Sequence, residues 1–268
     1  MRKNYSYKLT VICTALLLSE FLWADTQEEL AKKLANPIAA LISVPMQAEY
    51  DENFGPDEDG SRWKVNIQPV IPFSIGENWN VISRTILPVL DQEDMPIKGQ
   101  SDSGIGDVVQ SFFFSPKQPT ESGWIWGAGP VFLLDTASDD NLGGEQWGAG
   151  PTAVLLKQQG QWTVGMLANH IESFAGEDDR DDVSATFIQP FLSYITHTKT
   201  TFSISTESTY SWENSDWSVP INFSVKQMLK AGNQLFQVGG GVRYWAESPD
   251  GGAEDWGLRL ELIFLFPK

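Results

Sequence analysis

The sequence predicts an all-β protein, an antiparallel transmembrane β-barrel of about twelve strands with a short N-terminal helix. Three observations lead to this prediction. Twelve segments of roughly ten residues alternate between apolar and polar side chains, as strands between lipid and a lumen do. The connections between the segments are alternately brief and long, and most of the tryptophans stand near a segment end.

The first 24 residues have the plan of a cleaved secretory signal. Three basic residues precede the apolar run 9–18, and Leu22-Trp23-Ala24 forms a cleavage site ahead of Asp25. The run is too short for a transmembrane helix, which takes ~20 residues. We therefore expect export of the chain, and insertion of the barrel into the outer membrane of a Gram-negative cell.

Residues 25–39 carry the signals of a short amphipathic helix. Thr26 and Glu29 form a capping box, Leu30 and Leu34 share one helical face, and Asn36-Pro37 ends the helix. We expect this helix to act as a plug or lid for a barrel that occupies residues 40–268.

The predicted strands differ in how clearly they alternate. In 255–266, Leu258 and Leu260 face away from Arg259, and 62–75 is equally regular, whereas 104–115 and 162–172 alternate poorly. A tilted strand needs ~9–11 residues to cross a bilayer, which these segments supply. The twelve are 40–50, 62–75, 79–90, 104–115, 124–134, 147–158, 162–172, 185–196, 201–212, 219–228, 233–246 and 254–266.

The connections have opposite character at the two ends of the predicted meander. Those after even-numbered strands are brief and neutral to basic, whereas those after odd-numbered strands are longer and acidic. Outer-membrane barrels likewise have short periplasmic turns and longer external loops. A soluble β-sandwich or jelly roll remains the alternative, because its strands alternate too. The acidic loops are 51–60, 91–103, 135–146, 176–182 and 247–255.

Tryptophans near strand ends are expected in the membrane–water interface, where one edge of an indole is wet. Trp124, Trp212, Trp217 and Trp245 have such positions. The six residues predicted to form the interface girdle are Trp63, Trp79, Trp126, Trp147, Trp162 and Trp256.

The pentapeptide W-G-A-G-P occurs twice, at 126–130 and at 147–151. Each copy starts one of two consecutive strands, so antiparallel pairing places the copies at opposite ends of the barrel. The glycines of both copies leave room in the lumen or let the strand bend.

Charge and cysteine content exclude a nucleic-acid partner and cysteine chemistry. The formal charge is −17, and such an acidic chain repels the phosphates of nucleic acid. The single cysteine, Cys13, lies in the predicted signal, so the exported chain has no disulfide and no thiol nucleophile.

We expect no enzyme site, no cofactor and no dedicated metal site. His170 and His197 are the two histidines, and Ser173 follows His170 by three residues, which places it on the opposite face of a strand. The stretch 57–60 begins like a calcium loop but lacks the spaced ligands and the terminal glutamate.

Several stretches resemble a known group of proteins. I-Q-P-V-I-P-F at 67–73, W-N-x-I-S-R-T at 79–85, GIGDVVQSFFFSP at 104–116 and the two W-G-x-G-P strands are similar to Gram-negative outer-membrane proteins grouped as "meta-pathway of phenol degradation". The resemblance covers most of the chain from Asn36 onward. It implies an outer-membrane β-barrel that takes up hydrophobic or aromatic compounds, and it transfers no ligand residue.

Strand alternation directs charged side chains into the lumen, where they face water or one another. They either brace the barrel as cross-strand ion pairs or form a polar path or binding site, and the two roles overlap. The lumen-lining candidates are Arg84, Asp107, Glu207, Arg243, Arg259 and Glu261, with Glu49, Arg62, Lys64 and Lys226 on the same face.

Two functions fit these features. The first is a passive channel or transporter for small hydrophobic or aromatic compounds. The alternative is a structural or surface-interaction barrel whose acidic loops bind partners, or bind lipopolysaccharide through bridging divalent cations. Expected partners are outer-membrane lipid and lipopolysaccharide, the barrel-assembly machinery during biogenesis, and a small hydrophobic solute.

Overall fold

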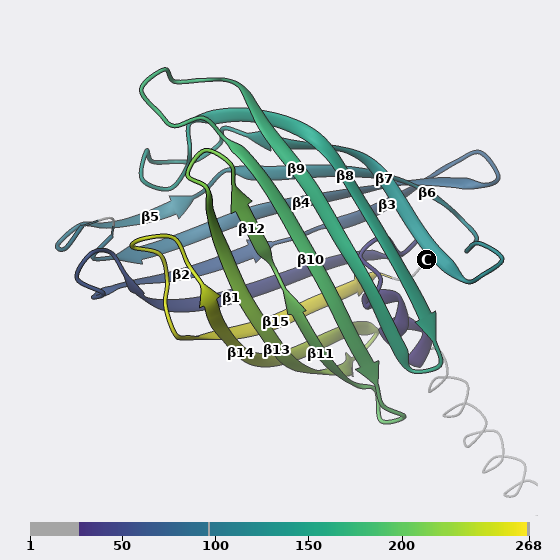
Figure 1. The fold of residues 1–268 in the computed structure, drawn as a ribbon. Coiled ribbons are helices and arrows are strands. Elements are labelled where there is room, and N and C mark those ends of the chain that lie inside the picture. The colour runs from purple at the N-terminus through teal and green to yellow at the C-terminus, as the bar shows by residue number, and fades with distance from the viewer. Residues whose placement is uncertain (1–26, 96, 267–268) are drawn as a thin grey trace, which may run out of the picture.

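The structure is a computed structural model that describes residues 27–95 and 97–266 (Figure 1). The predicted signal, 1–24, lies outside the described residues. One antiparallel sheet contains fifteen strands: β1 Ile42–Phe54, β2 Gly60–Ile67, β3 Val70–Ile75, β4 Trp79–Glu93, β5 Ser101–Ile105, β6 Val108–Pro116, β7 Trp124–Leu134, β8 Gln146–Gln159, β9 Trp162–Gly176, β10 Ser184–Ile195, β11 Thr200–Thr206, β12 Ser208–Ser211, β13 Asp216–Ala231, β14 Gln234–Glu247 and β15 Trp256–Phe266.

The sheet closes on itself because β15 pairs with β1, from Ile42 opposite Phe266 to Tyr50 opposite Leu258. Three pairs of consecutive strands share a barrel position. β2 and β3 both lie between β1 and β4, β5 and β6 both pair with β4, and β11 and β12 both lie between β10 and β13. The fifteen strands therefore occupy twelve positions, which confirms the predicted twelve-stranded antiparallel barrel.

The breaks within these positions have local causes. Pro69 separates β2 from β3, because proline has no N–H for a ladder hydrogen bond. Glu207 separates β11 from β12, and its carboxylate reaches past β13 and β14 to Arg259 on β15. The break between β11 and β12 thus coincides with a carboxylate that forms an ion pair inside the barrel.

The predicted alternation holds along the barrel wall. On β9 the side chains of Thr163 and Leu167 point inward and are 1 % exposed, whereas Val164 and Met166 point outward and are 49 % and 50 % exposed. Every second side chain of a strand faces outward, so this arrangement covers the outside with a band of exposed apolar groups.

Register places the two W-G-A-G-P copies at opposite ends of the β7–β8 hairpin. Pro130 is opposite Pro151, so Trp126 lies beside the short turn 117–123 and Trp147 beside the loop 135–145. Gly127 makes room for the N-terminal segment, since a Cβ there would stand 3.1 Å from Ile38 Cδ1. The repeat is positional, as the sequence predicts.

The N-terminal helix covers residues 27–34 and lies at the short-turn end of the barrel, beside the end of β15 (Figure 1). Leu30 and Ala31 pack in one cluster with Ile195, Met228 and Leu265 of the wall. After the helix, Ile38 enters a second cluster that contains Phe113 and Leu156 among other wall residues. The apolar core therefore lies at the short-turn end of the lumen, and the segment 27–41 packs against the barrel wall there.

Among the described residues, no helix is both long and apolar enough to cross a membrane.

Candidate functional site

A buried carboxylate, Glu49 of β1, is the centre of an ion-pair network in the lumen. Arg243 Nη1 of β14 lies 2.7 Å from Glu49 Oε2, and Arg259 Nη2 of β15 lies 2.5 Å from Glu49 Oε1. Lys64 of β2 adds a third cation at 3.0 Å, and Gln47 donates a hydrogen bond to Oε1. Three cations on one fully buried carboxylate offset the large cost of removing it from water.

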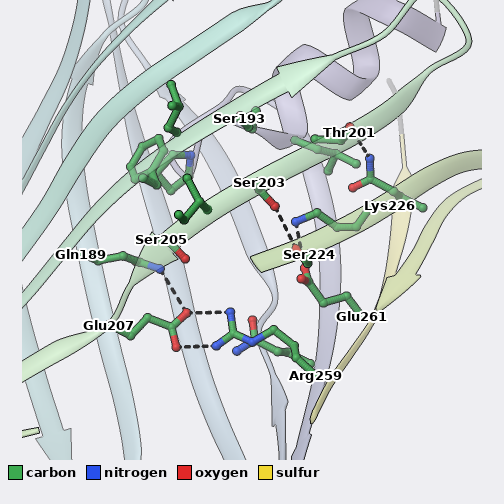
Figure 2. A pocket seen from close by; sticks show the side chains of 18 of the residues that line it. Gln189, Ser193, Thr201, Ser203, Ser205, Glu207, Ser224, Lys226, Arg259 and Glu261 are labelled. Carbon is green, nitrogen blue, oxygen red and sulfur yellow. Dashed lines mark hydrogen bonds and ion pairs between the residues drawn. The ribbon is translucent and has the colours of Figure 1, made fainter. Parts of the chain in front are cut away.

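Two further carboxylates complete this network. Glu207 accepts hydrogen bonds from Arg259 at 2.6 and 3.1 Å and from Gln189 at 3.3 Å, as the dashed lines in Figure 2 show. Asp51 accepts from Arg243 at 3.2 Å and from the indole of Trp245 at 2.9 Å. The network therefore joins β1, β14 and β15 to the break between β11 and β12.

Closer to the helix, the lumen is lined by hydroxyls and one separate ion pair. Lys226 of β13 lies 3.0 Å from Glu261 of β15. The hydroxyls of Ser203 and Ser224 are 2.8 Å apart, and Gln237 donates to Thr201 (Figure 2).

Two arginines differ from the others because, among the described residues, no carboxylate lies within ion-pair distance of either. Arg84 of β4 donates to Gln68 Oε1 at 2.9 Å. Arg62 of β2 stacks over Phe54 at 4.6 Å, and its buried Nε has no hydrogen-bond partner. Both side chains line the lumen as cations without a direct counter-charge.

Three cavities lined by described residues lie in the interior, with volumes of about 480, 180 and 160 Å3. The largest extends from the middle of the lumen to Trp245 near the loop end. The other two lie beside the N-terminal segment and are lined in part by Leu34 and Pro37. Gln47 and Arg84 line all three cavities, so the cavities meet at these two side chains.

The largest cavity has two chemically different walls. One wall, from β1, β2, β14 and the β11–β12 break, carries Arg62, Lys64, Arg243 and Glu207. The other, from β4 through β10, is mainly apolar and is formed by Ile86, Val109, Leu133, Ile171, Val183 and Phe187. Arg84 stands on the strand where the apolar wall begins, two residues before Ile86.

The structure brings most of the candidate lumen residues together. Arg84, Glu207, Arg243, Arg259 and Glu261 all line these cavities. Asp107 was predicted to line the lumen, but it lies in the break between β5 and β6 and binds the loop 135–145. Its carboxylate accepts hydrogen bonds from the amides of Thr136, Ala137 and Gly144 at 3.0, 3.1 and 2.7 Å.

The structure corrects the predicted positions of two residues, Trp245 and Asp51. Trp245 shares its strand face with Arg243 and lines the largest cavity, so its predicted interface position is wrong. Asp51 was assigned to a loop, but β1 continues through it and turns it inward. The alternation of side chains along a strand predicts both inward positions. Asp51 is two residues after the inward Glu49, and Trp245 is two residues after the inward Arg243.

The six girdle candidates are all exposed on the outer surface. At the loop end Trp63 packs on Tyr50 and Trp256 on Tyr244, with ring centroids 4.9 and 5.0 Å apart. At the turn end Trp162 packs on Tyr194 at 4.7 Å, and Trp79 lies edge-on to Trp126 at 5.8 Å. Aromatic residues thus form two belts, one at each end of the exposed apolar band.

The acidic loops are tied to one another by their few cations. Lys98 forms an ion pair with Asp59, and this hydrogen bond raises the pKa of Lys98. Arg180 donates to the carbonyls of Asp140 and Gly143 at 2.8 and 2.6 Å and pairs with Glu145.

The two histidines lie at separate places on the barrel. His170 is on the outward face of β9, where it contacts Glu172 and Thr186. His197 lies in the turn 196–199 and contacts Gln161. Within residues 27–95 and 97–266, no three His, Cys, Asp or Glu side chains are grouped so that they could hold a metal ion.

Comparison of the fold with solved structures finds outer-membrane β-barrels. The COG4313 outer membrane channel from Pseudomonas putida F1 superposes with a TM-score of 0.67 over 85% of this chain and 96% of that chain, at 14% identity. The β domain of the Bordetella autotransporter BrkA reaches a TM-score of 0.48 at 8% identity, over 85% of this chain and 100% of that chain. The first similarity shows the fold, a closed barrel of the type that an outer membrane channel has.

No protein-family model and no curated protein matches the sequence. The resemblance to the "meta-pathway of phenol degradation" barrels is therefore not confirmed and stays a prediction.

Proposed function

We propose that the protein is an outer-membrane channel, through which small solutes diffuse along the barrel interior and past the N-terminal segment. The observation that carries the proposal is the series of cavities that meet at Gln47 and Arg84. The largest reaches Trp245 toward the loop end, and the smallest reaches Lys33 and Leu41 at the helix end. Together they supply polar and apolar surface along most of the lumen.

The membrane location rests on the outer surface. An apolar band that side chains such as Leu155, Met166 and Leu260 expose would be costly in water, and the two aromatic belts match the interfaces of a bilayer. The acidic loops then face outside, and the short turns and the helix face the periplasm. In this setting the partners are lipid, lipopolysaccharide and, during insertion, the barrel-assembly machinery.

The interior favours a channel over a purely structural or surface-interaction barrel. Twelve strands enclose a space that side chains and a short helix are able to fill. Here cavities of about 480, 180 and 160 Å3 remain. The apolar wall of the largest supports small hydrophobic or aromatic compounds as solutes, the class that the sequence resemblance implies.

We expect the helix to limit flux, because Leu30 and Ala31 are buried against the wall at the short-turn end. The test is conductance in planar bilayers for the full chain and two variants. Leu30→Asp places a carboxylate in the apolar cluster and should release the helix, which raises conductance. Leu30→Met, which keeps an apolar side chain of similar volume in the cluster, should conduct as the unmodified protein does. Absence of conductance and of solute flux in all three folded proteins would refute the channel.

A further inference from the structure

We propose that the largest cavity binds a small carboxylate with an apolar body, and that Arg84 holds its carboxylate group. The inference rests on the proposed channel, whose solute class it specifies. The cavity volume, about 480 Å3, falls in the ~300–1,000 Å3 range of small-molecule sites. Within residues 27–95 and 97–266, no carboxylate forms an ion pair with Arg84, whose hydrogen-bond partner is the Gln68 amide.

The first step concerns charge. Six basic and two acidic side chains of the barrel strands and their breaks line the three cavities, and the buried carboxylates of Glu49 and Asp51 contact three of the basic ones. This excess contrasts with the formal charge of −17 for the whole chain. The basic residues are Arg62, Lys64, Arg84, Lys226, Arg243 and Arg259, and the acidic ones are Glu49, Asp51, Glu207 and Glu261.

The second step locates the excess. Lys64, Arg243 and Arg259 share Glu49, and Lys226 pairs with Glu261. Arg84 and Arg62 contact the neutral Gln68 amide and the Phe54 ring. Asp51 is the register partner of Arg62, but among the described residues no carboxylate lies within ion-pair distance of either arginine. A guanidinium shielded from water without a counter-ion is unfavourable, and a carboxylate that binds it through two parallel hydrogen bonds relieves that cost.

The third step concerns the rest of the ligand. Ile86 and Val109 are paired on neighbouring strands, and Val109 pairs in turn with Leu133. Together with Ile171 and Phe187 they give Arg84 an apolar neighbourhood on one side of the cavity. A ligand whose charge lies at one end and whose other end is apolar fits both surfaces, whereas an inorganic anion would use only the arginine.

Arg62 extends the path toward the loops. Its register partner on β4 is Gln92, eight residues beyond Arg84, which is ~26 Å along a strand. The two guanidinium groups, neither of which forms an ion pair among the described residues, therefore mark successive positions for an anion that moves from the loop end to the site. Cations at such spacing attract an anion past the acidic rim without trapping it at one place.

The test measures binding directly, by isothermal titration calorimetry on the folded full chain in detergent, with sodium benzoate, benzamide and sodium acetate as probes. Benzoate should bind saturably, while the neutral benzamide and the short acetate should each bind about tenfold more weakly or less. This comparison needs no variant. Equal affinity for benzoate and benzamide would overturn the proposal.

Variants then assign the residues. Arg84→Gln should weaken benzoate binding about tenfold, Arg84→Lys should restore part of it, and Lys98→Gln, with the same change of charge in a distant loop, should have no effect. Ile171→Ser should weaken benzoate and leave acetate unchanged. Benzoate binding that is indifferent to Arg84→Gln would remove Arg84 from the site.

Conductance separates this inference from the proposed function. Conductance without benzoate binding would remove the carboxylate site and leave the channel. Benzoate binding in a protein that never conducts would keep the site and remove the channel.

Discussion

Glu49 and Arg259 stand directly opposite each other at the seam where the last strand meets the first, with 2.5 Å between Arg259 Nη2 and Glu49 Oε1. The two residues are 210 positions apart in the sequence. Their contact exists only in the closed barrel, so the ion-pair network and the closure of the sheet depend on each other.

Replacing Glu49 tests the network. Glu49→Gln leaves Lys64, Arg243 and Arg259 facing one another without their shared carboxylate, and it should destabilise the barrel by about 3 kcal/mol. Urea unfolding in lipid vesicles, followed by tryptophan fluorescence, measures the change. Glu93→Gln, at an exposed position at the end of β4, is the matched control and should change stability little. Equal effects of the two substitutions would show that the network contributes nothing to stability.

An arginine scan of β9 tests the membrane-facing side. Met166→Arg places a charge in the middle of the exposed apolar band and should cost ~2–4 kcal/mol in a bilayer. Asn169→Arg, on the same strand but facing the largest cavity, should cost much less. Folding is measured by heat-modifiable gel migration and by urea titration in vesicles. Equal tolerance at the two positions would contradict the assignment of a lipid-facing side.

The fit of the N-terminal segment can be tested at Gly127. A Cβ at this position would lie 3.1 Å from Ile38 Cδ1 and 3.4 Å from Phe113 Cβ, so Gly127→Leu should push Ile38 out of its cluster. Such overpacking costs ~1–3 kcal/mol unless the segment leaves, and its departure should raise conductance in planar bilayers. Ala128→Leu, the adjacent residue on the outer face, should leave conductance unchanged. If both variants conduct alike, Ile38 does not help to hold the segment in the lumen.

Labelling of intact cells tests the orientation. The predicted exported chain contains no cysteine, so an introduced cysteine is the sole target of a membrane-impermeant maleimide. Asp179→Cys, in the acidic loop after β9, should react, and Thr198→Cys, in the turn 196–199, should react only after the cells are broken. The reverse pattern would invert the barrel in the membrane.

Sequence alone determined the wall of this protein. Alternation assigned Leu258 and Leu260 to one face and Arg259 to the other, and it counted twelve strands even where 104–115 and 162–172 alternate weakly. The physical reason is local: successive side chains of any strand point to opposite sides. The same rule places Trp245 on the inward face with Arg243, although Trp245 lies near a strand end.

Only the tertiary structure decided what meets inside the barrel. Glu49 contacts Arg243 and Arg259 because the sheet closes in one register, and Arg84 lacks a carboxylate because Glu207 is bound to Arg259 instead. Because the strand is interrupted at Gly106 and Asp107, the Asp107 carboxylate accepts hydrogen bonds from the loop 135–145 and does not line the cavities. The helix signal at 26–37 did not say which cavity the helix would fill. These features depend on distances between strands far apart in the chain, and strand parity carries no information about such distances.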